Sequence, residues 1–167
     1  MKRLMTSAIA ASALIGGGSL IADGASAQTA KDIEGSWHLV SATVSQEGRT
    51  RNIFGDSPTG IMEFDAGGRF IQVIVSADLP KFASKSREKG TADENRAVVQ
   101  GSIAFFGTYA VGTGGIVNLH IQGSTFANMS GSDQQRAIRI SGDELIWANA
   151  TPAVGSGTAE QLWKRAK

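Results

Sequence analysis

The chain has 167 residues, of which 41% are hydrophobic and 19% are charged, and its formal net charge is +1. It contains no cysteine, which excludes a disulfide framework and a lipid-modified cysteine as a membrane tether. Because the charge is nearly balanced and Lys and Arg do not cluster, the sequence lacks the basic footprint of a nucleic-acid-binding protein and a polybasic patch for anionic lipid.

The first 27 residues have the pattern of a secretory signal peptide. Met1–Arg3 is a short basic start, Leu4–Ala22 is mainly apolar, and Ala25–Ala27 is a small-x-small cleavage motif. A membrane anchor is the alternative, since the apolar run is nearly long enough to span a bilayer. Three glycines at Gly16–Gly18 and the charge of Asp23 weaken such a helix. We therefore expect a bacterial protein that is exported to the periplasm or the medium, without membrane insertion after cleavage.

Cleavage after Ala27 removes Lys2, Arg3 and Asp23 and leaves equal numbers of basic and acidic side chains. We expect residues 28–34 to be a flexible polar segment. The remaining residues 35–167 are expected to form one domain, whose length allows a single hydrophobic core without disulfides or metals.

Eight segments of the mature chain have strand composition, with β-branched and aromatic residues between turn formers. They are residues 36–45, 61–64, 69–75, 103–111, 116–122, 135–141, 144–150 and 160–166. The strongest local signal is a hairpin in which Asp65–Gly68 connects the second and third of these segments. Four aromatic residues of these segments are expected in the core: Phe70, Phe105, Phe106 and Trp147.

The chain between the third and fourth strands has a helix signal. Thr91 and Glu94 have the spacing of a capping box, and acidic residues occupy the first turn. These features predict a short helix over Ala92–Gln100 that ends at Gly101. The segment could be a lid or plug, or it could be a plain surface crossover.

Eight antiparallel strands leave two exposed edges unless the sheet closes on itself. A closed sheet of eight strands encloses enough space for side chains or one small ligand. We expect Gly35 to allow a tight turn and Trp37 to plug the narrow end, where Trp163 and Arg165 of the last strand return. The sequence therefore predicts an all-β fold, an eight-stranded antiparallel up-and-down β-barrel with one short helix between strands 3 and 4.

A series of short motifs covers nearly all of the mature chain. They are Gly35-x-Trp37-x-Leu39-Val40-Ser41, Phe54-Gly55, Pro58-x-Gly60, Asp65-x-Gly67-Gly68-Arg69, Gly107-Thr108-Tyr109, His120, Asn128, Gly131, Gln134-x-Arg136 and Leu162-Trp163-Lys164-Arg165. In this order the motifs resemble the bacterial lipocalin-like domain family of the calycin superfamily. The resemblance implies an eight-stranded barrel with a ligand cavity, but no particular ligand or activity. The chain departs from the family at Ala127–Met129, where Pro-Asn-Trp is usual, and lacks the C-terminal helix of typical lipocalins.

Five polar residues are candidates for ligand binding: Tyr109, Asn118, His120, Asn128 and Arg136. All lie on neighbouring predicted strands or on the loop between them, and all but Asn118 match the family pattern. If their side chains point inward, they form either a satisfied polar network or the seat of a polar ligand.

Strand alternation leaves the direction of His120 open. Asn118, His120 and Gln122 share one face of their strand, and the apolar residues Val117, Leu119 and Ile121 share the other. An inward His120 would be a titratable group inside the barrel. An outward His120 would be an ordinary surface histidine.

No cofactor or metal site is predicted, because the chain has two histidines, no cysteine and no carboxylate at metal-ligand spacing from His120. Three functions remain. The first is binding of a small hydrophobic or amphipathic molecule inside the barrel. The second is a small-molecule isomerase or cyclase, with His120 as general acid and base and Tyr109 and Arg136 orienting the substrate. The third is a filled structural or stress-related barrel. The sequence does not predict the oligomeric state.

Overall fold

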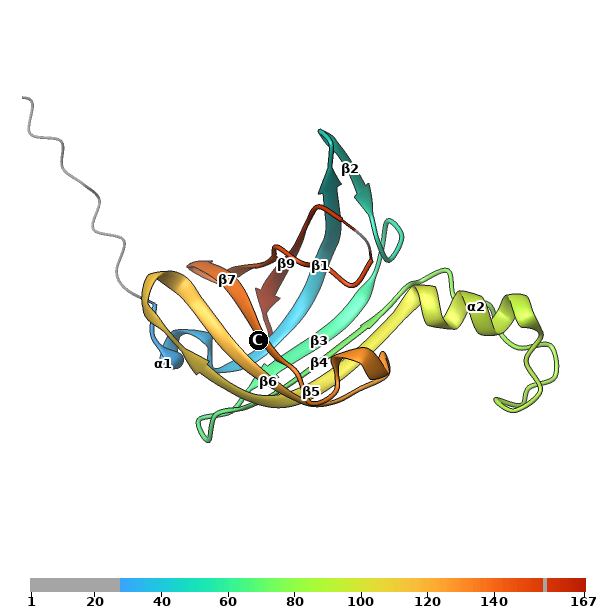
Figure 1. The fold of residues 1–167 in the computed structure, drawn as a ribbon, viewed down its shortest axis with the longest axis horizontal. Coiled ribbons are helices and arrows are strands. Elements are labelled where there is room, and N and C mark those ends of the chain that lie inside the picture. The colour runs from blue at the N-terminus through green and yellow to red at the C-terminus, as the bar shows by residue number, and fades with distance from the viewer. Residues whose placement is uncertain (1–27, 155) are drawn as a thin grey trace, which may run out of the picture.

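The computed structural model describes residues 28–154 and 156–167, so the signal-peptide prediction for residues 1–27 lies outside it. The described chain forms nine strands and a few short helices (Figure 1). The strands are β1 (Gly35–Gln46), β2 (Arg49–Asn52), β3 (Thr59–Phe64), β4 (Arg69–Val75), β5 (Ser102–Val111), β6 (Ile116–Ser124), β7 (Asp133–Ser141), β8 (Glu144–Asn149) and β9 (Thr158–Arg165). The helices are α1 (Ala30–Ile33) and α2 (Ala92–Gly101), with 3₁₀ turns η1 (Thr113–Gly115) and η2 (Ala127–Met129).

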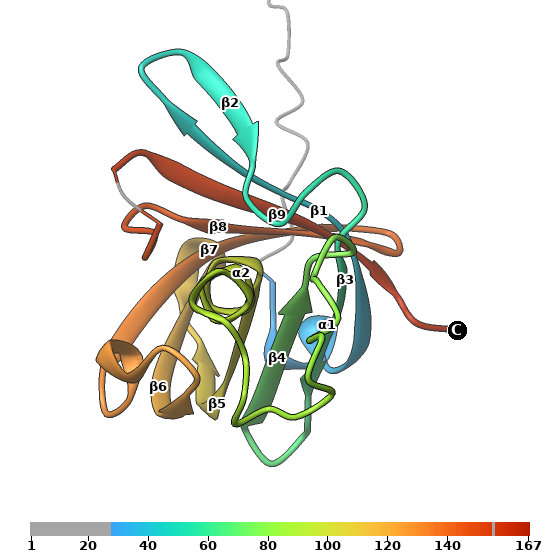
Figure 2. The same ribbon diagram turned by 90° about the vertical axis from the view of Figure 1, so that its right-hand side faces the viewer.

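Eight of the nine strands close into a barrel (Figure 2). The order is β1-β3-β4-β5-β6-β7-β8-β9, every pair is antiparallel, and β9 pairs with β1 from Trp37↔Arg165 to Ser45↔Thr158. The predicted eight-stranded antiparallel barrel is therefore confirmed. The extra strand β2 forms a hairpin with the second half of β1, whereas β3 pairs with the first half. Because β1 extends past the barrel in this way, β2 projects beyond the barrel wall.

Aromatic side chains fill the half of the barrel nearest α1. Phe64 packs against Phe70, Tyr109 and Trp147, with ring centroids 6.1, 4.9 and 5.7 Å away. Three of the four aromatic residues that were expected in the core are buried, but Phe106 is 50% exposed. Phe105 and Phe106 are consecutive on β5, so their side chains point to opposite faces of the sheet and only Phe105 reaches the interior.

The closed end of the barrel is plugged by residues 30–37. In place of the expected flexible segment there is a single helical turn, α1, whose Ile33 is 0% exposed. The Trp37 indole Nε1 donates a hydrogen bond to the Ile33 carbonyl, 2.9 Å away. The Arg165 guanidinium carbon lies 4.1 Å from the Trp37 ring centroid, and its nitrogens donate to the carbonyls of Asp32 and Glu34 at 2.8 Å.

Gly35 begins β1 with a φ of 106°, which a residue with a side chain rarely adopts. A Cβ atom added there would lie 3.3 Å from the Arg165 Nη1 atom. Trp163, the other residue expected at this closure, is fully buried. Residues far apart in the chain therefore hold the closed end together.

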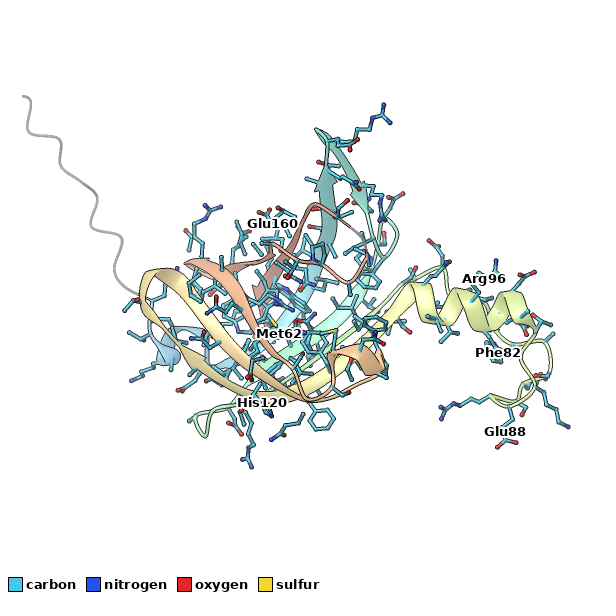
Figure 3. All side chains as sticks on the ribbon, viewed as in Figure 1. Met62, Phe82, Glu88, Arg96, His120 and Glu160 are labelled. Atoms are coloured by element: carbon cyan, nitrogen blue, oxygen red, sulfur yellow. The ribbon has the colours of Figure 1, made fainter. Side chains whose placement is uncertain are left out.

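The predicted helix between the third and fourth barrel strands is present as α2, and its capping box is complete. Thr91 Oγ1 accepts from the Glu94 N–H at 3.2 Å, and the Glu94 carboxylate accepts from the Thr91 N–H at 2.7 Å. No residue of α2 is buried. The helix projects away from the barrel in Figure 1, and Figure 3 shows Phe82 and Arg96 on this excursion. No residue of α2 lines the interior cavity, so α2 is a surface crossover and not a plug.

No helix within the described ranges is long and apolar enough to cross a membrane.

Candidate functional site

A small cavity of about 70 Å³ lies inside the barrel at the end opposite α1. Its walls come from the inner faces of β4, β5, β7, β8 and β9, and its rim from the loops that follow β2 and β8. Sites that enclose a whole drug-sized ligand have volumes of about 300–1,000 Å³. The cavity therefore has room for a small group, and anything larger must extend through the barrel mouth.

Gln72 places an unpaired polar atom in this cavity. It lies between Phe70 and Ile74 on β4, and strand alternation points all three side chains inward. The Gln72 side chain is 1% exposed, and its Oε1 atom has no hydrogen-bond partner within the described part of the chain. Burial of a polar atom without a partner costs about 1–3 kcal/mol. A ligand group or an ordered water that pairs with Gln72 would remove this cost.

Arg136 places a positive charge in the same cavity. It alternates with the buried Ile138 on β7 and is only 5% exposed. Its Nη1 atom donates to the Gln135 carbonyl at 2.7 Å, and its Nη2 atom donates to the Gln134 side-chain oxygen. Burial lowers the pKa of Arg136 to about 10, so the guanidinium remains charged at neutral pH.

No carboxylate balances this charge, since no Asp or Glu of residues 28–154 and 156–167 lines the cavity. Apart from Tyr and Trp, Gln72 and Arg136 are the two polar side chains classed as buried in that part of the chain. Both line the same 70 Å³ space. The polar content of the interior is therefore concentrated at one place, beside the open mouth.

The other polar side chains that line the cavity are Asn149 and Gln161, whose amide oxygens accept hydrogen bonds from the Thr151 N–H and the Trp163 indole, and the rest of the lining is apolar. Phe105 and Trp147 form its inner wall, and Met129 of η2 reaches in from the loop before β7. The rim contains five apolar residues from two loops: Ile53, Phe54, Pro152, Ala153 and Val154. Polar side chains inside the cavity and apolar side chains at its rim match a molecule that has a polar head and an apolar body.

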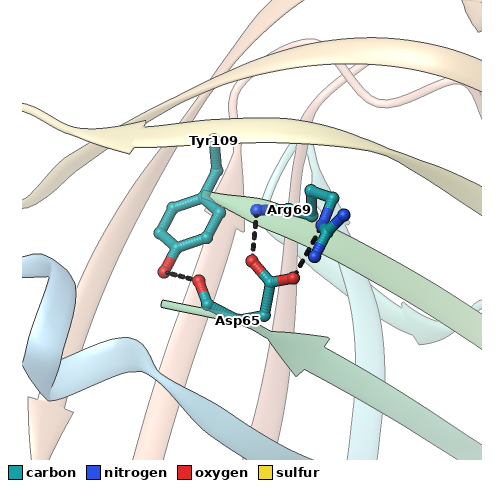
Figure 4. A network of polar contacts seen from close by, with 3 residues as sticks. All are labelled: Asp65, Arg69 and Tyr109. Atoms are coloured by element: carbon teal, nitrogen blue, oxygen red, sulfur yellow. Dashed lines mark hydrogen bonds and ion pairs between the residues drawn. The ribbon is translucent and has the colours of Figure 1, made fainter. Parts of the chain in front are cut away.

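Tyr109 lies at the other end of the barrel and has a structural role. Its hydroxyl donates to the Asp65 carbonyl at 2.9 Å, and the Asp65 carboxylate accepts from the backbone N–H and the Nε–H of Arg69, both at 2.8 Å (Figure 4). Burial raises the pKa of the Tyr109 phenol, and the nearby negative charges of Glu34 and Asp65 raise it further. The network holds the β3–β4 hairpin to β5.

This network predicts acid sensitivity of the hairpin. The Arg69 backbone N–H, and then its side chain, hold the pKa of Asp65 below its ordinary value of about 3.9. A lowered folded-state pKa contributes stability at neutral pH that is lost as the pH falls below about 3.9. We expect Asp65→Asn to lower the melting temperature at pH 7, and the difference from wild type to shrink towards pH 2. Thermal melts at several pH values test this, and a difference that is the same at every pH would contradict it.

His120 and Asn118 lie on the outer face of β6, because the apolar set of Val117, Leu119 and Ile121 faces inward. His120 Nδ1 lies 2.8 Å from an Asp133 carboxylate oxygen, and both side chains are more than half exposed. Figure 3 shows His120 on the outside of the barrel. Asn118 accepts a hydrogen bond from the Gln135 amide at 2.8 Å.

These residues line an open groove of about 880 Å³ on the outer surface, which also includes part of Tyr109. The groove is larger than the interior cavity, but its polar groups face water and pair with one another. An exposed ion pair contributes only about 0–1 kcal/mol. The smaller cavity, with buried and unbalanced polar groups, is therefore the stronger candidate.

The five candidate residues do not form one cluster. Arg136 lines the interior cavity, Tyr109 ties down a hairpin, and Asn118 and His120 face outward. Asn128 is exposed in η2, the loop between β6 and β7. Sequence reasoning missed Gln72, although its position between two inward apolar residues of a strand was a usable signal. No group of three or more His, Asp or Glu side chains that could hold a metal occurs in the described ranges.

The fold and the cavity define a closed β-barrel with a small interior site. The sequence profile of the lipocalin-like domain family matches residues 34–166, so the chain belongs to that family. A search of curated proteins finds no match to the chain.

Proposed function

We propose that this protein binds a small amphipathic molecule at the mouth of its barrel, with the polar head inside and the apolar body at the rim. The observation that carries the proposal is the buried Oε1 atom of Gln72 in the cavity, which has no hydrogen-bond partner among residues 28–154 and 156–167. In a barrel that binds no ligand, this atom would only destabilise the fold, because an apolar residue of similar size would avoid the free-energy cost of burying it. Membership of the lipocalin-like family supports the same function.

The cavity volume limits how the molecule binds. About 70 Å³ accepts a head group of a few heavy atoms, and the remainder must lie against Ile53, Phe54, Pro152, Ala153 and Val154. Val154 is 42% exposed, so this rim presents apolar surface to solvent when no molecule is bound. Covering this surface supplies the hydrophobic part of the affinity, about 25 cal/mol per Å² of apolar area removed from water.

The two alternatives have less support. An isomerase or cyclase would need a general acid or base inside the barrel, and His120 is on the outer face. A filled structural barrel describes the half near α1, where Trp37, Trp163 and Leu145 are fully buried. It does not explain why the other half contains Gln72 and Arg136.

Export is part of the proposal. If residues 1–27 are removed during secretion, the binding site acts outside the cytoplasm, in the periplasm or the medium. An apolar rim would there meet amphipathic molecules that are dilute in water or released from membranes.

The test is titration of the purified protein with 1-decanol, below its solubility limit, and with decanoate, below its critical micelle concentration. Trp147 lines the cavity, so its fluorescence reports binding, and calorimetry gives the stoichiometry. We expect saturable 1:1 binding of at least one of the two. Ala159→Leu adds volume to the cavity wall and should weaken binding about tenfold or more, since overpacked sites lose complementarity.

Ala110→Leu is the matched control, because Ala110 is exposed on β5. It should leave the affinity unchanged. If neither amphiphile binds up to its solubility, or if both leucine variants have the same effect, the proposed function is wrong.

A further inference from the structure

We infer that the head group of the bound molecule is a carboxylate, held by the guanidinium of Arg136. This inference rests on the proposed function and specifies the chemistry of the same site. The protein buries the positive charge of Arg136 without an acidic side chain of residues 28–154 and 156–167 beside it. Arg136 is 5% exposed, and no Asp or Glu in the described part of the chain lines the cavity beside it.

A buried charge without a partner is rare in folded proteins, because it loses its hydration and gains nothing in return. Arg136 donates hydrogen bonds to the Gln135 carbonyl and the Gln134 side-chain oxygen, and both of these acceptors are neutral. The two bonds orient the guanidinium without neutralising it. The site is therefore positive at neutral pH and favours an anion over a neutral or cationic head.

Guanidinium chemistry favours a carboxylate among anions. A guanidinium carries five N–H donors in a planar fork, and two hydrogen bonds to the protein leave donors for a ligand. A carboxylate matches this fork with two parallel bonds in the same plane. Its two oxygens also suit a cavity of about 70 Å³ better than the four oxygens of a phosphate or sulfate.

Gln72 can complete the recognition. Its amide has an oxygen acceptor on one side and an NH₂ donor on the other, and a half-turn of the amide exchanges them at little cost in shape. Within the described residues, the Oε1 atom has no partner that would hold the amide in its present orientation. A bound carboxylate would select the orientation that presents the NH₂ group.

The test compares three probes with the same ten-carbon chain: decanoate, 1-decanol and decylamine. We expect the wild-type protein to bind decanoate about tenfold or more tightly than 1-decanol, and decylamine most weakly, since a charge-assisted pair outweighs a neutral hydrogen bond. Arg136→Gln should remove the preference, so that decanoate and 1-decanol bind with affinities within about twofold of each other. Arg136→Lys keeps the charge without the fork and should retain part of the preference.

Arg139→Gln is the matched control, because Arg139 is exposed on the outer face of the same strand. It should leave all three affinities unchanged. Equal binding of decanoate and 1-decanol by the wild-type protein would overturn the carboxylate inference and leave the proposed function standing. The carboxylate inference also fails if the preference survives in a folded Arg136→Gln variant. If no probe binds, both proposals fail.

Discussion

Trp37→Ala should cost about 3–5 kcal/mol of folding free energy, the range measured for removal of a large buried aromatic side chain. The Trp37 side chain is 0% exposed, stacks under Arg165 and donates to the Ile33 carbonyl. Its loss would leave a cavity at the closed end and remove the contacts that join α1 to the last strand. For a domain of this size, the melting temperature should fall by about 12–20 °C.

Two neighbouring variants make this prediction specific. His38→Ala changes the next residue, which points outward from β1, and should alter stability by less than about 0.5 kcal/mol. Trp37→Phe keeps a ring beneath Arg165 but lacks the indole N–H. Its loss of folding free energy should therefore lie between those of His38→Ala and Trp37→Ala. If Trp37→Ala melts within a few degrees of wild type, the closed end does not depend on this plug.

Gln72→Leu should have the opposite sign and make the protein more stable. An apolar side chain of similar size removes the unpaired Oε1 atom, so we expect a gain of about 1–3 kcal/mol and a rise in melting temperature of about 4–12 °C. The same variant should bind decanoate more weakly. A residue that lowers stability while it supports binding is expected at a functional site.

Gln122→Leu is the control for this variant, since Gln122 is exposed on the outer face of β6. It should change stability by less than about 0.5 kcal/mol. A large loss of stability in Gln72→Leu would contradict the prediction, because it would mean that Gln72 makes an interior hydrogen bond in the free protein.

Sequence reasoning was sufficient for the barrel because strand alternation and turn chemistry act locally. The Asp65–Gly68 hairpin and the capping box of Thr91 and Glu94 are short-range features, and both are present. Closure required one long-range inference, that Trp37 and Arg165 lie together, and the β1–β9 pairing brings them into register. The helical turn α1 was not predicted, because four residues have little intrinsic helical stability and Ile33 is held there by the barrel.

The site was harder to predict because alternation assigns residues to two faces without saying which face is interior. On β6 the apolar face is buried and His120 is exposed, as hydrophobic burial favours. On β7 the same principle would turn Arg136 outward, yet its alternation with Ile138 turns it inward. Arg139, by contrast, lies on the outer face of β7 and is exposed, as most arginines are. The strand register and the function of the site determine that Arg136 is buried, and neither can be derived from the local sequence pattern.

The most direct measurement is an NMR titration of the side-chain N–H signals of Arg136 and Gln72 with decanoate. Binding of a carboxylate in the barrel predicts saturable shifts of the Arg136 Nε–H and the Gln72 NH₂ signals at one equivalent, with the Arg139 signal unchanged. If the Arg136 and Gln72 signals stay in place while decanoate is in excess, or if the shifts occur only on the outer surface, the interior of this barrel is not a binding site for such molecules.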